Sequence, residues 1–140
     1  MIGTRLLFRA LLLSVLMVAV TQALLSQTAA DVRGRWSGSF HSNHSDVAPF
    51  TITVVITPNS KGHLVGNSEL NSKCLKGADL QVTVTGAEVV LAGSDKQGNN
   101  MTLRGTLDNT GTLLKSTYIL NGSATGGCET DDGTGTLTRR

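Results

Sequence analysis

Two histidines and an aspartate lie close together in the segment His41-Ser-Asn-His44-Ser-Asp46. Imidazole nitrogens and carboxylate oxygens are ligands of Zn²⁺ and Cu²⁺, so a metal site is one interpretation of this segment. The chain's third histidine, His63, is predicted to lie at the opposite end of the domain. The ligand count therefore favours a solvated polar loop, with no metal and no cofactor.

An acidic segment, Glu129-Thr-Asp131-Asp132-Gly133, lies near the end of the chain. Oxygen-rich loops can hold Ca²⁺, but this spacing does not match the EF-hand pattern of acidic residues. Asp and Gly are also the residues that turns favour. We therefore predict a turn with solvated carboxylates.

The sequence contains no pattern typical of a hydrolase. It has no G-x-S-x-G segment, which would place a nucleophilic serine at a strand-to-helix turn. Glu69 and Glu88 are the only acidic residues in predicted strands, so paired carboxylates on facing strands are missing as well. We predict that the protein is not an enzyme and has no catalytic residues.

The elements that must position these residues are strands. Apolar residues alternate with Thr, Ser, Arg, Lys and Gln, which is the period of a strand with one buried face. Fifteen glycines after residue 30 disfavour helix. The alternation predicts eight strands, at Arg33–Phe40, Phe50–Thr57, His63–Leu70, Leu80–Thr85, Ala87–Ala92, Met101–Leu107, Thr112–Leu120 and Thr134–Arg139.

These strands predict an all-β domain, an antiparallel up-and-down meander that closes into a barrel. The alternation directs aromatic and aliphatic residues inward, with Val55, Val90 and Ile119 as apolar exceptions on the outer face. A polar outer face excludes a lipid-facing barrel, so we expect no stable membrane insertion of this domain.

Residues 1–30 have the features of a secretory signal peptide, which leaves residues 31–140 as the barrel domain. Arg5 and Arg9 precede an apolar run, and small residues at Ala23 and Ala30 offer cleavage sites. The alternative is a membrane anchor, but the run is short for a span.

Ten basic and ten acidic residues follow residue 30. A neutral domain is not expected to bind nucleic acid, and we predict a secreted or periplasmic monomer.

The two cysteines, Cys74 and Cys128, both lie in the exported part. An even number of cysteines in an oxidising compartment favours a disulfide. In a meander, successive connections alternate between the two ends, and both cysteines fall in the longer connections at one end. The other end has only tight turns.

The first and last strands carry a resemblance to a known group. Gly34-Arg35-Trp36 opens the first strand, and Leu137-Thr138-Arg139 closes the last. This pattern resembles the lipocalin and avidin-like barrels, the calycin group, and also small secreted bacterial β-proteins that have a cysteine pair. The resemblance implies that Trp36 plugs the closed end beneath Arg139, with Gly34 beside them, and that a ligand enters at the other end. The single Trp departs from the several that hold biotin in avidins, so neither family's activity is transferred.

Two functions follow from a barrel of this kind. The first is non-catalytic binding of a small apolar or amphipathic ligand at the loop end. Its site would be floored by Phe40, Phe50 and Tyr118 and bounded by His41, His44, Lys73, Lys96 and Glu129. The second is a structural or protein- or glycan-interaction module whose core is filled. The volume of the interior distinguishes them, because eight strands enclose space for either side chains or one small ligand.

Overall fold

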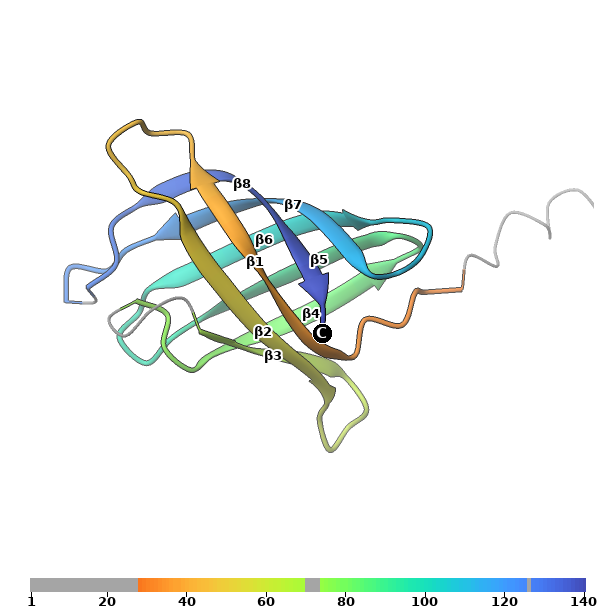
Figure 1. The fold of residues 1–140 in the computed structure, drawn as a ribbon. Helices are drawn as coiled ribbons and strands as arrows, with labels where there is room; N and C mark the ends of the chain where they lie inside the picture. Colours follow the sequence, from red (N-terminus) through yellow and green to blue (C-terminus); the bar gives the residue numbers. More distant parts are fainter. Residues whose placement is uncertain (1–27, 70–73, 126) are drawn as a thin grey trace, which may run out of the picture.

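A computed structural model describes residues 28–69, 74–125 and 127–140. The strands are β1 (Gly34–Ser42), β2 (Phe50–Pro58), β3 (Leu64–Glu69), β4 (Ala78–Thr85), β5 (Glu88–Ser94), β6 (Asn100–Leu107), β7 (Leu113–Asn121) and β8 (Asp131–Arg139). Each strand pairs antiparallel with the next, and β8 pairs with β1 (Figure 1). The predicted all-β meander is confirmed as a closed barrel, consistent with a calycin-like fold.

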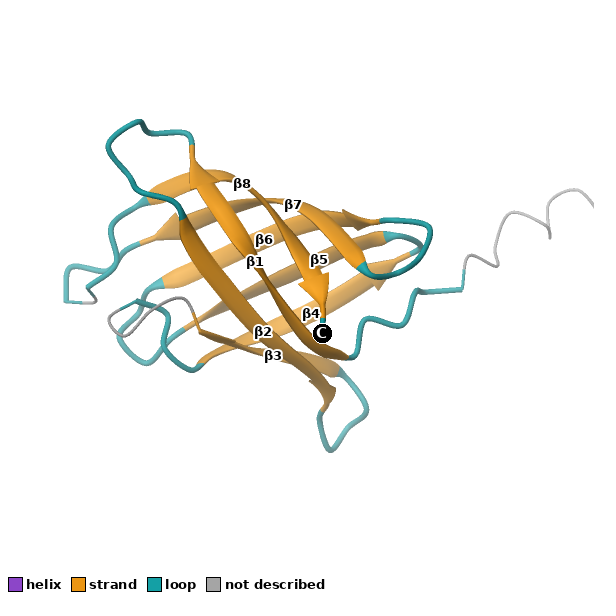
Figure 2. Cartoon of the chain, viewed as in Figure 1, coloured by secondary structure: helices purple, strands orange, loops and turns teal. Residues whose placement is uncertain are grey.

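The described residues contain strands and loops but no helix (Figure 2). Accordingly, none of them forms a helix long and apolar enough to cross a lipid bilayer. The signal-peptide helix expected within residues 1–30 lies, except for residues 28–30, outside the described part of the chain.

Alternation along each strand builds the barrel because the two faces meet different surroundings. In β7, Leu114, Tyr118 and Leu120 are buried, whereas Lys115 and Ile119 between them are exposed. The predicted strand ends agree with the structure to within three residues, and several agree with no difference. The largest difference is at β8, which begins at Asp131 and not at Thr134.

The end with the short connections is closed by Trp36. Its indole is 1% exposed, and Nε1 donates a hydrogen bond to the carbonyl of Val32 over 2.8 Å. The guanidinium of Arg139 lies 5.7 Å from the indole centroid, within cation–π range. Arg139 also donates to the carbonyls of Asp31 and Arg33, at 3.1 and 2.5 Å. The chain that precedes β1 is thereby held across the floor of the barrel.

The other end carries the four longer connections, on the left in Figure 1. A disulfide joins Cys74, after β3, to Cys128, before β8, as the sequence predicted. The described residues contain no free cysteine. The bond joins the β3–β4 connection to the β7–β8 connection, which lie across the barrel from each other in the strand order.

Candidate functional site

The interior near the loop end is filled by the side chains that were expected to floor a ligand pocket. Ring centroids of Phe40, Phe50 and Tyr118 lie 5.3 to 6.1 Å apart, with Tyr118 edge-on to both phenylalanines. Phe40 is 0% exposed and Tyr118 is 2% exposed. These contacts lie in the range at which aromatic rings stabilise one another. The three aromatic residues that were predicted to floor the site therefore pack against one another as part of the hydrophobic core.

Leu75 covers the same core from the loop between β3 and β4. It is fully buried and adopts a φ of 53°, a left-handed conformation that is unfavourable for a bulky residue. That conformation costs about 1–2 kcal/mol, whereas burying a leucine contributes about 1.5–3 kcal/mol. Burial therefore offsets the backbone cost. The adjacent disulfide joins Cys74 to Cys128.

A buried carboxylate lies above the aromatic cluster. Asp131, at the start of β8, is 7% exposed and accepts hydrogen bonds of 2.5 Å from the Tyr118 hydroxyl and from the Ser42 hydroxyl. Burial acts to raise the pKa of Asp131, but these hydrogen bonds outweigh it and hold the pKa below its ordinary value. The tyrosine responds in the opposite direction, because burial and the carboxylate both raise its pKa.

This arrangement corrects the prediction that residues 129–133 form a turn with solvated carboxylates. Asp131 points into the barrel as part of a strand, and only Glu129 and Asp132 keep substantial contact with solvent. Across the described residues, no group of three or more His, Cys, Asp or Glu side chains is placed to hold a metal ion.

The loop between β1 and β2 is joined to β8 through Asp132. The backbone N–H of Asn43 donates to the backbone carbonyl of Asp132 over 2.8 Å. The side-chain Nδ2 of Asn43 donates to Oδ2 of Asp132 over 2.6 Å. His44 Nε2 lies 3.3 Å from Oδ1 of the same carboxylate. The His44 amide donates to the Ser42 hydroxyl, which in turn donates to Asp131. The β1–β2 loop and the buried carboxylate of Asp131 therefore belong to one hydrogen-bonded network, which we call the rim network.

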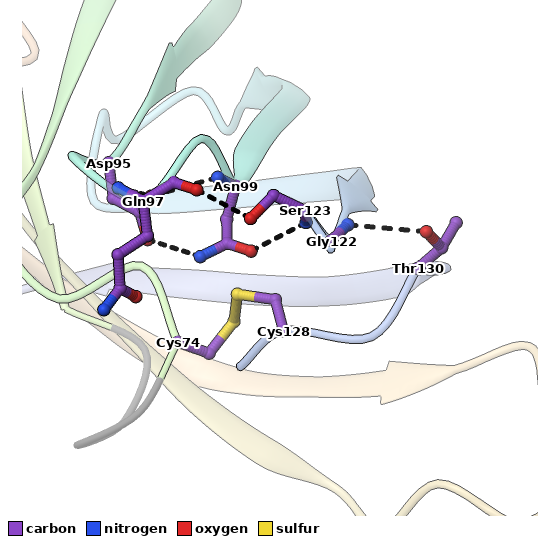
Figure 3. The surroundings of a disulfide bond; sticks show 8 residues. All are labelled: Cys74, Asp95, Gln97, Asn99, Gly122, Ser123, Cys128 and Thr130. Carbon is purple, nitrogen blue, oxygen red and sulfur yellow. Dashed lines mark hydrogen bonds between the residues drawn. A yellow bond between two sulfur atoms is a disulfide. The ribbon is translucent and has the colours of Figure 1, made fainter. Parts of the chain in front are cut away.

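The loop between β5 and β6 is joined to the loop between β7 and β8 (Figure 3). Asn99 is fully buried; its Nδ2 donates to Asp95 over 2.7 Å, and its Oδ1 accepts from the amide of Ser123 over 2.9 Å. The Ser123 hydroxyl donates to the carbonyl of Gln97 over 2.6 Å. Burial acts to raise the pKa of Asp95, but hydrogen bonds from Asn99, Gln97 and Leu75 hold it below its ordinary value.

A cleft of about 420 Å³ lies between the loop that joins β1 to β2 and the segment that leads into β8, above the packed core. Its apolar wall is formed by Val47, Ala48, Phe50 and Leu120, together with the disulfide. Its polar groups are His44, Asp46, Glu129, Thr130 and Asp131. The cleft thus combines an apolar surface with polar groups from the β1–β2 loop and from the segment that leads into β8.

The structure brings only some of the predicted ligand-binding residues together. His44, Phe50 and Glu129 line this cleft, while Phe40 and Tyr118 lie buried beneath it. His41 points away from it and lines a groove on the outer wall. Lys96 is exposed in the loop between β5 and β6 and does not line the cleft, and Lys73 lies outside the described residues.

Sequence reasoning did not single out Asp131 as a buried residue or Asn99 as a loop-joining residue. The sequence does contain a pattern that indicates the turn before Asn99. In Asp95-Lys-Gln-Gly-Asn99, the Asp and the Gly have the spacing of a turn in which the aspartate side chain bonds to the backbone. No protein-family model matches the chain, and no curated protein sequence matches it significantly.

Proposed function

We propose that this protein is an exported, non-catalytic binding protein that takes up a small amphipathic molecule in the loop-end cleft. The observation that carries the proposal is the cleft itself. Its volume of about 420 Å³ falls in the range of small-molecule sites. Such sites combine an apolar lining with a few placed polar groups, and this cleft has both.

The position of the ligand follows from the packed interior. Phe40, Tyr118 and Leu75 are buried beneath the cleft, so the apolar part of the ligand would lie against Phe50, Val47 and Leu120. The polar part would face the carboxylates of Asp46 and Glu129. Because carboxylates outnumber the single imidazole there, a neutral or positively charged polar group is favoured over an anion.

The geometry supports a non-catalytic role. His44 faces Asp132, while the Ser42 hydroxyl donates to Asp131. A serine nucleophile is usually activated by a hydrogen bond to a base such as histidine. The Ser42 hydroxyl and the His44 imidazole make no such hydrogen bond with each other. An oxidising compartment is supported by the disulfide.

Filling the cleft tests the proposal. Ala48 is exposed in the cleft wall, so Ala48→Trp should block it without disturbing the core. Ala124 is also exposed but does not line the cleft, so Ala124→Trp is the matched control. Binding of the fluorescent apolar dye Nile red would be titrated in each. We expect Ala48→Trp to weaken binding about tenfold or more, equal to about 1.4 kcal/mol, and Ala124→Trp to leave it unchanged.

Competition then tests the charge preference. Dodecyltrimethylammonium should displace the dye at lower concentration than dodecyl sulfate, each used below its micelle concentration. Native mass spectrometry of protein purified from its own source should show a bound small molecule that the Ala48→Trp variant lacks. Equal dye binding by both tryptophan variants, or no binding by the wild type, would refute the cleft as the site.

A further inference from the structure

A second hollow lies on the outer wall of the barrel, away from the loop-end cleft. It has a volume of about 710 Å³ and crosses the outer faces of β5, β6, β7, β8 and β1. We call it the wall groove. Its lining includes the hydroxyl side chains of Ser39, Thr106, Thr117, Thr134 and Thr136.

Glycine causes the wall to be recessed at this place. Gly105, Ser116 and Gly135 are neighbours across β6, β7 and β8, and the row continues to Phe40 in β1. A Cβ atom at Gly135 would overlap the Phe40 ring, and one at Gly105 would lie 2.7 Å from the carbonyl oxygen of Lys115. Because the backbone lies directly against the core, the outer surface is hollowed above it.

Strand register places the polar groups of the groove in two adjoining rows. Glu88, Thr106, Lys115, Thr136 and Ser39 follow one another across five strands. Arg104, Thr117, Thr134 and His41 form the next row. The groove is therefore a continuous strip of hydroxyls with two fixed positive charges near its middle and a single carboxylate at the β5 end.

The charged groups of the groove are available to a ligand. Within the described part of the chain, the side chains of Arg104, Lys115 and His41 make no hydrogen bond or ion pair. All three are exposed. The groove therefore presents hydrogen-bond donors, two of them permanently charged, that no neighbouring side chain occupies.

The shape and chemistry of the groove select among extended partners. A peptide cannot add as a strand, because a closed barrel has no free edge. A folded protein would need aromatic or aliphatic anchors at the centre of its interface, and the groove provides none. Single-stranded nucleic acid would need aromatic side chains for base stacking and more cations. A hydroxyl-rich, negatively charged chain fits the donors that are present.

We propose that the wall groove binds an acidic polysaccharide. Arg104 and Lys115 would pair with its carboxylates, and the threonine hydroxyls would hydrogen-bond to its sugar hydroxyls. Charge-assisted hydrogen bonds are the stronger kind, so the two cations carry most of the discrimination between charged and neutral chains. This site is independent of the loop-end cleft, and either one can exist without the other.

The test uses sodium polygalacturonate as the probe and its fully methyl-esterified form as the uncharged control. Binding would be measured by isothermal titration calorimetry for the wild type and two double variants. Arg104→Gln/Lys115→Gln removes the groove cations. Lys61→Gln/Lys96→Gln removes the same charge from exposed loops at the two ends of the barrel. Thermal unfolding would check that both variants are folded.

We expect the groove variant to bind polygalacturonate about tenfold or more weakly, the loop variant to bind like the wild type, and the esterified chain to bind little. The Ala48→Trp variant should bind polygalacturonate normally, which separates this site from the cleft. Equal losses in both double variants would reduce the effect to net charge and overturn the proposal. No binding by the wild type, or equally tight binding of poly-glutamate, would also overturn it.

Discussion

The hydrogen bond between Tyr118 and Asp131 can be removed by the isosteric change Tyr118→Phe. The ring keeps its contacts with Phe40 and Phe50, because only the hydroxyl is lost. Asp131 would keep the hydrogen bond from Ser42 and remain buried. The variant therefore isolates one charge-assisted bond of the network that joins the core to the rim.

The expected loss of stability follows from the burial of both partners. A hydrogen bond to a charged group contributes about 1.5–3 kcal/mol. Tyr118 is 2% exposed and Asp131 is 7% exposed, so water cannot readily replace the lost donor. We expect the free energy of unfolding to fall by about 2 kcal/mol, which for a domain of this size lowers Tm by roughly 8 °C.

The pH dependence gives a sharper check. The folded pKa of Asp131 lies below its unfolded value, so this carboxylate contributes stability above about pH 4 that is lost as the pH falls through the folded pKa. Tyr118→Phe removes one donor that lowers this pKa. The variant should therefore lose less stability than the wild type as the pH falls below about 4, so the difference between the two proteins should shrink in acid.

Urea unfolding from pH 3 to pH 8 would measure both effects. Asp131→Asn, alone and combined with Tyr118→Phe, completes a double-mutant cycle. Without the carboxylate, loss of the tyrosine hydroxyl should cost less than it does in the wild type. A loss below about 0.5 kcal/mol at pH 7, or a loss that does not change with pH, would refute a charge-assisted bond.

Three further predictions concern the scaffold. Replacing Cys74 and Cys128 by serine should lower the free energy of unfolding by about 4 kcal/mol in the chain-entropy model for a loop of 54 residues; denaturant titration would contradict this with a loss below about 1 kcal/mol. Trp36→Ala should cost about 3–5 kcal/mol, and an unchanged thermal unfolding curve would rule out its role as a plug. The buried Ser68 hydroxyl has no hydrogen-bond partner in the described part of the chain, so Ser68→Ala should raise stability by about 1 kcal/mol. A loss on the same change would indicate a bound water.

The sequence predicts the fold well because period-two alternation is continuous in most strands. In β7, Leu114, Ser116, Tyr118 and Leu120 alternate with polar residues, with Ile119 as the exception, and only one face is buried. Turn residues separate the strands, and the alternation of connections between two ends places both cysteines at one end. The disulfide and the closed meander follow from these local signals.

The start of β8 was missed because its inward face has no apolar signal. Asp131, Gly133 and Gly135 point inward before Leu137, and neither an acid nor a glycine indicates burial by hydropathy. Asp131 is buried because Tyr118, on the neighbouring strand, supplies a donor. That partner is fixed by strand register, which the sequence of β8 alone does not contain.

The sequence did not predict the burial of Leu75 or the outward direction of His41. A single leucine between Cys74 and Lys76 has no periodicity, and its positive φ is one that leucine rarely adopts. His41 and His44 are three residues apart, but β1 ends between them, at Ser42. The strand therefore directs His41 outward, while the loop brings His44 to the cleft.

The contact between Phe40 and Gly135 links the filled interior to the hollowed outer wall. An eight-stranded barrel encloses room for side chains or for one small ligand, but not for both. Phe40 takes up that space and is accommodated because Gly135 has no side chain, so the wall lies against the ring. The same residue pair therefore fills part of the interior and recesses the outer wall at the groove. The two proposed binding sites accordingly lie outside the interior, at the loop-end cleft and the wall groove.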